Sequence, residues 1–247
     1  MSDEYQPGFY QLDARVRDAA GRRRQADKIV RALARHGVPA DGVCLDVGCS
    51  AGEITRTVAP LFRIVMGLDY DATALGAIDR ALRHETLYIH GDAMHLPLRE
   101  GAVSAVICAQ VYEHVPDADR LMAEIHRVLA PGGVVFFSGP NALYPIEPHY
   151  HLPCLHWLPR RWAGRLLRLI GRGERYYERP RTPWGLQRMV RRFRLQDITL
   201  DVLRERVASI GGARGVAARL TPTWVWRALW PLLPNYNWIL TKPPEGE

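Results

Sequence analysis

A segment of eight residues, LDVGCSAG at positions 45–52, has the composition best suited to hold a small ligand. Gly48 and Gly52 lack the side chains that would keep a ligand away from the backbone. A helix that begins after Gly52 would direct free N–H groups and a positive dipole end toward a carboxylate. The segment therefore predicts a turn that binds an anionic group between a strand and a helix.

A second acidic position strengthens this prediction. Asp69 ends the apolar run 63–68 and lies 21 residues after Gly48, the spacing that one strand–helix–strand unit requires. A carboxylate there can accept hydrogen bonds from both hydroxyls of a ribose. An NAD site is disfavoured, because the turn reads GxSxG instead of GxGxxG and Asp46 occupies a position that is usually apolar.

Alternating apolar runs and helical patterns predict the elements that position these residues. We expect an α/β fold, in which helices cover both faces of a Rossmann-like, seven-stranded, mostly parallel sheet. Residues 1–140 would form the ligand-binding core with an N-terminal helix. Residues 141–247 would add an active-site loop, a basic helical cap or insertion, and the last two strands of the same sheet. The expected strands are 43–47, 63–68, 87–90, 103–109, 134–138, 195–200 and 236–241, and the expected helices are 12–36, 54–61, 72–83, 117–129, 160–172 and 185–193.

The order of these motifs resembles that of class I S-adenosylmethionine (SAM)-dependent methyltransferases of the UbiE-like, "methyltransferase 11" group. LDVGCSAG is similar to the first motif of that group, GLDYD to the second and GDAMHLP to the third, and residues 104–115 with LAPGG resemble the later ones. The resemblance runs from about residue 43 to residue 141, and it implies SAM as the cofactor. Ser50 departs from the pattern, because the group usually has glycine there.

The resemblance also implies which residues contact SAM. The methionine part would lie at the turn, the ribose at Asp69, the adenine between Tyr70 and the Asp92–Ala93 pair, and the methyl group near Gln110 and Val111. The implied cofactor-binding residues are Asp46, Gly48, Cys49, Ser50, Gly52, Asp69, Tyr70, Asp92, Ala93, Gln110 and Val111.

A histidine after the fourth strand is a candidate general base. His114 would lie at the carboxyl edge of the sheet, where open α/β folds bind ligands, and its ordinary pKa is close to neutrality. Alternatively, Glu113 and His114 only close the strand and cap the next segment. Some quinone-pathway O-methyltransferases have Glu-x-x-Glu-His here and hold a divalent metal, but Gln110 replaces the first acid. No metal is therefore expected.

A loop rich in histidine and proline follows the fifth strand. It contains His149 and His151, which become candidates for substrate contact or proton removal if the loop covers the active site. Packing of an aromatic loop explains the composition equally well. Zinc is disfavoured, because His-x-His-x-x-Cys-x-His is not a usual structural spacing.

Charge divides the chain into two parts. Residues 1–140 carry 15 basic and 18 acidic side chains, whereas residues 141–247 carry 18 and 8. The basic part contains two apolar stripes: one on the helix expected at 160–172, with Trp162, Leu166, Leu169 and Ile170, and one in 221–233 with three tryptophans. Both suit an anionic membrane surface, but packing on the sheet or a dimer contact is equally consistent. No RNA-binding module accompanies the basic residues, so nucleic acid is disfavoured.

The compartment and the function follow from these observations. Four dispersed cysteines and the absence of a secretory signal pattern predict a cytoplasmic protein, with membrane association at the inner face as an open alternative. We expect a SAM-dependent methyltransferase that acts on a small-molecule or lipid-like acceptor, with O-methylation favoured. The alternatives are a non-catalytic binding or regulatory protein of the same fold, and a methyltransferase that acts on RNA. The sequence predicts no oligomeric state.

Overall fold

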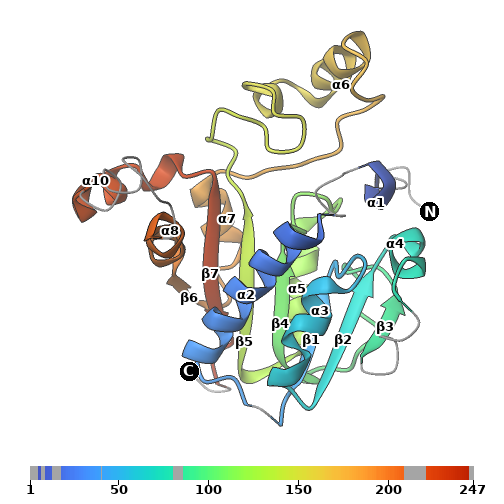
Figure 1. The fold of residues 1–247 in the computed structure, drawn as a ribbon, viewed down its shortest axis with the longest axis vertical. Helices are drawn as coiled ribbons and strands as arrows, with labels where there is room; N and C mark the ends of the chain where they lie inside the picture. The colour runs from blue at the N-terminus through green and yellow to red at the C-terminus, as the bar shows by residue number, and fades with distance from the viewer. Residues whose placement is uncertain are drawn as a thin grey trace.

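A seven-stranded sheet forms the centre of the computed structural model, which describes residues 5–6, 9–12, 18–39, 41–79, 86–208 and 221–244. The strand order is β3-β2-β1-β4-β5-β7-β6, and β7 runs antiparallel to both of its neighbours (Figure 1). This arrangement confirms the predicted fold class, including the last two strands in the same sheet. The strands are β1 (Val43–Val47), β2 (Ile64–Asp69), β3 (Leu87–His90), β4 (Val103–Ala109), β5 (Leu129–Pro140), β6 (Arg194–Asp197) and β7 (Asn235–Thr241).

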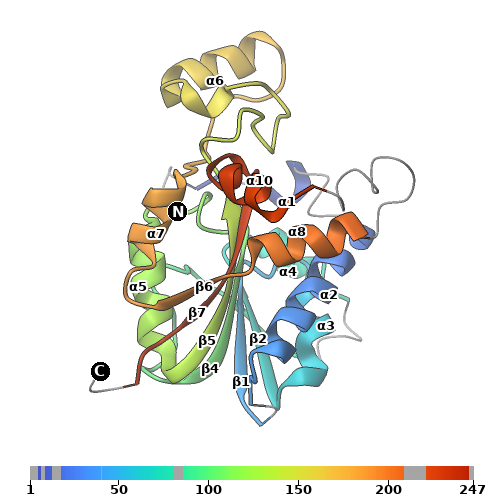
Figure 2. The ribbon, with the colours of Figure 1, turned by 90° about the vertical axis from the view of Figure 1, so that its left-hand side faces the viewer.

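Helices cover both faces of the sheet, as the apolar character of its central strands requires (Figure 2). On one face, α5 (Ala118–Val128) and α7 (Pro183–Met189) pack into a core with Phe137 and Trp238. On the other face, α2 (Ala19–Arg35) and α3 (Glu53–Val58) pack into a core with Phe136. The remaining elements are α1 (Phe9–Leu12), the 3-10 helix Ala59–Leu61, α4 (Ala72–Gly76), α8 (Thr199–Ala208), α10 (Thr223–Ala228) and the 3-10 helix Trp230–Leu232.

The predicted elements differ from the observed ones mainly at their ends. The N-terminal helix was expected from residue 12, but the described helix α2 begins at Ala19, and residues 13–17 lie outside the described part. The helix expected at 72–83 ends at Gly76, and residues 80–85 lie outside the described part. The sixth strand was expected to reach Leu200, which is wrong. It ends at Asp197, whose side chain accepts a hydrogen bond from the Thr199 N–H as α8 begins.

Between β5 and α7 the chain leaves the sheet and forms a separate lobe, here residues 142–181. The ends of the lobe lie together, because the Ala142 N–H donates to the Arg181 carbonyl oxygen at 3.0 Å. The lobe contains the 3-10 helix Leu155–Trp157 and the helix α6 (Arg160–Leu169), and it lies beyond the carboxyl edge of the parallel strands (Figures 1 and 2). It has a small core of its own, formed by Leu155, Ala163, Leu167 and Tyr176.

Candidate cofactor and acceptor site

The turn after β1 has the backbone conformation that its glycines predict. Gly48 and Gly52 have φ values of 70° and 78°, and Ser50 has a φ of 53°. This left-handed conformation explains why the resembling group has glycine at position 50, since a residue with a Cβ adopts it at a cost of about 1–2 kcal/mol. The N–H of Gly48 donates to the Leu68 carbonyl oxygen at 2.8 Å and thereby fixes the turn against β2. A Cβ at position 48 would lie 2.7 Å from a methyl carbon of Val111.

The Asp69 carboxylate lies beside this turn, at the end of β2. One of its oxygens accepts the Ser50 N–H at 2.7 Å and the other accepts the Asp71 N–H at 2.8 Å. Burial raises the pKa of Asp69, and these two hydrogen bonds act in the opposite direction. Because a carboxylate offers about four acceptor positions, two are left for the hydroxyls of a ribose.

A cavity of about 310 Å³ opens next to Asp69. It lies where the carboxyl ends of the adjacent strands β2, β1 and β4 meet, the usual ligand position in this type of fold. Nine of the candidate site residues line it: Gly48, Ser50, Asp69, Tyr70, Ala93, Gln110, Val111, His114 and His149. The structure thus brings most of the candidate residues to one place.

Three residues of the first motif support the turn without lining the cavity. Asp46 is 2% exposed and accepts the Thr55 hydroxyl at 2.7 Å, and burial raises its pKa to about 6. The sulfur of Cys49 packs toward β2, 2.8 Å from where a Cβ at position 67 would lie. A Cβ at position 52 would lie 2.5 Å from the Tyr88 hydroxyl. These residues hold the turn, and their predicted contact with SAM stays a prediction.

Asp92 and His151 also lie outside the cavity lining. Asp92 accepts the Met94 N–H at 2.8 Å and shapes the turn after β3. His151 is exposed, and its backbone N–H donates to the Glu147 carbonyl oxygen at 2.9 Å. Of the two histidines predicted in the loop, His149 is therefore the one placed to meet a ligand.

Arg22 is a site residue that sequence reasoning missed. It lies in the first turns of α2 and lines the cavity, and its Nε and Nη2 are buried without a hydrogen-bond partner in the described structure. Its charge also lowers the pKa values of Asp46 and Asp69. A buried guanidinium with free donors needs an anionic partner, and the carboxylate of the methionine part of SAM would provide one. The residues present thus fit SAM.

An N-terminal segment covers this cavity. The Tyr5 ring is stacked on Tyr70 at 4.1 Å with an interplanar angle of 17°, and its hydroxyl donates to Asp92 at 2.8 Å. These are two of the residues predicted to contact adenine, so Tyr5 lies where the adenine ring is expected. Phe9 packs against His114 at 4.6 Å, at the other end of the cavity. Neither residue was predicted, because residues 1–12 show no motif.

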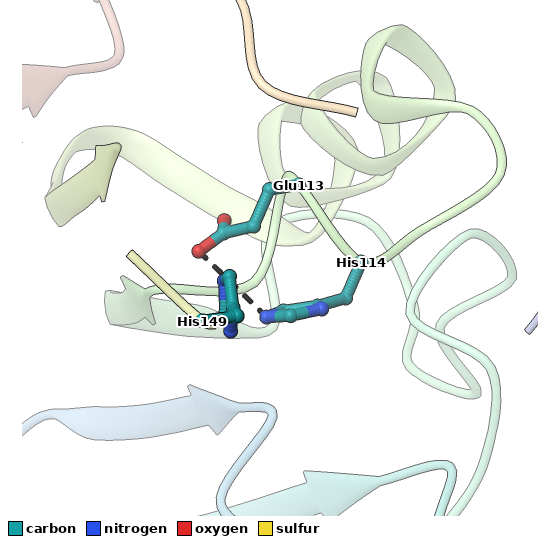
Figure 3. Close-up of side chains that lie close together, drawn as sticks. All are labelled: Glu113, His114 and His149. Atoms are coloured by element: carbon teal, nitrogen blue, oxygen red, sulfur yellow. Dashed lines mark ion pairs between the residues drawn. The ribbon is translucent and has the colours of Figure 1, made fainter. Parts of the chain in front are cut away.

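The candidate acceptor end contains Glu113, His114 and His149 (Figure 3). Glu113 is fully buried, and its Oε1 lies 3.8 Å from Nε2 of His114. The His114 and His149 rings lie 4.8 Å apart, and ligand atoms of all three residues lie within 4.8 Å of one another. The group can share or transfer a proton, and it has donor atoms that a divalent cation accepts.

Gln110 does not belong to this group. Its side-chain amide donates to the Asn235 side chain on β7 at 2.8 Å, and its backbone has a φ of 62°. A glutamate at this position in the resembling enzymes was the reason to consider a metal. The expectation that the protein needs no metal stays a prediction.

Comparisons with known proteins agree with this geometry. The family model "Methyltransferase domain" matches residues 45–137. A probable S-adenosylmethionine-dependent methyltransferase of Mycolicibacterium smegmatis is 37% identical over 40% of this chain and 38% of its own length. A ubiquinone biosynthesis O-methyltransferase of Burkholderia thailandensis is 34% identical over 39% of this chain and 44% of its own length. The chain therefore spans less than half of these curated relatives.

A solved structure shows the same fold over a longer stretch. Phosphoethanolamine N-methyltransferase 2 of Haemonchus contortus, in complex with S-adenosyl-L-methionine, aligns with 89% of this chain and 53% of its own chain, with a TM-score of 0.55 and 17% identity. Residues 45–137 are thus a methyltransferase domain of class I, the SAM-dependent kind. None of the helices in the described ranges is long and apolar enough to cross a membrane.

Proposed function

We propose that the protein transfers the methyl group of SAM to a small or lipid-like acceptor, with a hydroxyl as the favoured nucleophile. One observation carries the proposal: a single cavity joins Asp69 and Arg22, which suit the ribose and the carboxylate of SAM, to the His114–His149 pair. The name of the Burkholderia relative supports O-methylation.

The residues of this chain would contribute mainly orientation. Asp69 binds the ribose, Arg22 binds the carboxylate, and Val111 lies against the turn near the expected methyl group. SAM supplies an activated methyl group when it is bound, so correct placement of the acceptor accounts for much of the rate. His149 or His114 accepts the proton of the acceptor hydroxyl, and the buried Glu113 stabilises the charged imidazole.

Calorimetric titration with SAM, S-adenosylhomocysteine and NAD tests the cofactor. We expect saturable binding of the two adenosyl ligands and none of NAD. Asp69→Ala should abolish binding, whereas Asp41→Ala, at an exposed position before β1, should not. No binding of SAM to the unaltered protein would refute the proposal.

A second experiment separates an enzyme from a non-catalytic binding protein. With candidate phenolic and lipid-like acceptors, we expect methyl transfer that falls at least about tenfold in His149→Gln, while SAM binding is retained. SAM binding without transfer to any such acceptor would favour the non-catalytic alternative.

A further inference from the structure

Helix α6 has one face in the lobe and another in solvent. Ala163 and Leu167 are fully buried in the lobe's small core, and Gly164 packs against the backbone of residues 174–176. The opposite side is apolar and exposed, with Leu169 83% and Trp162 50% accessible. We use "the apolar face" for Trp157, Leu158, Trp162, Leu166, Leu169 and Ile170, all of which are exposed.

The exposure of this face excludes one of the alternatives considered from the sequence, namely that the stripe on α6 packs on the sheet. For the stripe of Trp162, Leu166, Leu169 and Ile170 the sequence left three alternatives: an anionic membrane surface, packing on the sheet, or a dimer contact. Because α6 lies beyond the carboxyl edge of the strands, it does not cover the sheet (Figures 1 and 2). A contiguous exposed surface of this kind marks an interaction site.

Arginines accompany the apolar face on α6. The lobe, residues 142–181, contains eight arginines and three glutamates, a net charge of +5. Two of those glutamates, Glu147 and Glu178, are only 1% and 3% exposed. Arg161, Arg165 and Arg168 are exposed on α6 and form no ion pair with an acid in the described structure. The exposed charges that α6 itself presents beside the apolar face are therefore all cationic.

We propose that the apolar face and its arginines dock the lobe on an anionic lipid bilayer. Exposed tryptophan and leucine side chains would enter the boundary between headgroups and acyl chains, and the arginines would pair with lipid phosphates. Arg165 already lies over the Trp162 ring, with its guanidinium carbon 4.9 Å from the ring centroid. This places a cation and an aromatic ring together, as they occur at membrane interfaces.

The charge argues against two other partners. A second copy of this chain would bring two sets of unpaired arginines together, and like charges at an interface are unfavourable. A nucleic acid would satisfy the arginines, but it would leave the exposed leucines without an apolar partner. An anionic bilayer satisfies both kinds of side chain at once.

The lobe also connects this surface to the cavity. Pro148 and His149 line the cavity, and the same lobe continues from them to α6. Docking of α6 would therefore hold the candidate acceptor end close to the bilayer. The corollary that the acceptor is itself a membrane lipid rests on the proposed function, whereas docking does not.

Vesicle flotation tests the proposal directly on the full chain. We compare vesicles of phosphatidylcholine alone with vesicles that contain phosphatidylglycerol. Flotation is expected with the anionic vesicles, with a decrease as the salt concentration rises, because exposed charges are screened over about 8–10 Å at physiological ionic strength. Equal flotation with both vesicle types, or with neither, would overturn the proposal.

Variants show which side chains are responsible. Leu169→Ser and Trp162→Ala should each weaken binding to anionic vesicles by about tenfold or more, the effect expected for one buried apolar side chain. Trp224→Ala is the matched control, because Trp224 is 71% exposed on α10, outside the lobe. Arg165→Gln and Arg168→Gln should each reduce the salt dependence of binding to the anionic vesicles. Loss of binding in Trp224→Ala alone would refute the assignment to the lobe.

Two further measurements distinguish the competing outcomes. Sedimentation equilibrium should give a monomer whose mass is unchanged in Leu169→Ser, and a dimer that this variant dissociates would show that a second copy covers the apolar face. Calorimetry with SAM should give the same affinity in Leu169→Ser as in the unaltered protein. Vesicle binding without SAM binding would support docking and refute the proposed function. SAM binding without vesicle binding would refute docking and leave the proposed function standing.

Discussion

Asp46 is buried as a charge beside the glycine turn, and its replacement by asparagine should stabilise the protein. The Asp46 side chain is 2% exposed, and burial raises its pKa from the ordinary 3.8 to about 6. An asparagine has nearly the same shape, and its carbonyl oxygen can still accept the Thr55 hydroxyl that bonds Asp46 at 2.7 Å. Asp46→Asn therefore removes the buried charge and leaves the packing in place.

The magnitude follows from the two pKa values of Asp46. Because its pKa is higher in the folded state, the folded protein binds more protons between about pH 4 and pH 6, and its stability falls as the pH rises through that window. A pKa of about 6 against 3.8 corresponds to roughly 3 kcal/mol in the free energy of unfolding. Asp46→Asn should gain up to about this amount at pH 7.5 and almost nothing at pH 4.

Urea denaturation of both proteins between pH 4 and pH 7.5 measures this difference. Asp41→Asn is the control, because Asp41 is exposed and its replacement should change little. A stability difference that does not depend on pH, or a variant that is less stable at pH 7.5, would refute the reasoning. The variant should also bind SAM more weakly, since the charge that destabilises the fold lies next to the turn for the cofactor.

Three further substitutions test the site. Gly48→Ala should abolish SAM binding in calorimetry, because the new Cβ would meet Val111 at 2.7 Å. The control is Gly171→Ala, where φ is a similar 66° and nothing lies within 4 Å of the new Cβ; in denaturation it should cost only about 1 kcal/mol of stability. Arg22→Gln should weaken SAM binding at least about tenfold but leave the affinity for 5′-methylthioadenosine, which has no carboxylate, unchanged; equal loss of both ligands would contradict the assigned role. Tyr5→Ala should raise the affinity for SAM several-fold in the same titration, because Tyr5 is stacked where the adenine is expected, and a lower affinity would show that Tyr5 assists binding instead.

The strands could be predicted closely because their signals are local. The runs 43–47 and 103–109 coincide with β1 and β4, since buried parallel strands consist of short apolar runs bounded by turns. The run 87–90 coincides with β3, an edge strand in which no residue is buried. β5 is longer than expected, because the LAPGG segment itself pairs with β4 across an irregularity in register. Leu200 was assigned to a strand because apolar periodicity alone does not separate a short strand from the first turn of a helix.

The site was predicted where its residues follow strands and missed where they do not. Asp69 is the last residue of β2 and His114 lies in the segment that follows β4, and the sheet brings them to one edge. Arg22 is the first of three consecutive arginines on α2, and nothing in the sequence distinguishes it from the exposed Arg23. Tyr5 reaches the cavity only through the tertiary fold. His149 and His151 could not be separated, because loop conformation decides which of them faces inward.

The lobe lies just beyond the segment that matches the methyltransferase domain in sequence. The match to the methyltransferase domain ends at residue 137, and the lobe begins a few residues later, between two segments that the Ala142–Arg181 hydrogen bond holds side by side. Because the lobe packs its own core, replacing it should leave the sheet and the cofactor turn undisturbed. Under the proposed function, the unit placed to meet the acceptor could thus be exchanged while the unit placed to hold the methyl donor is kept.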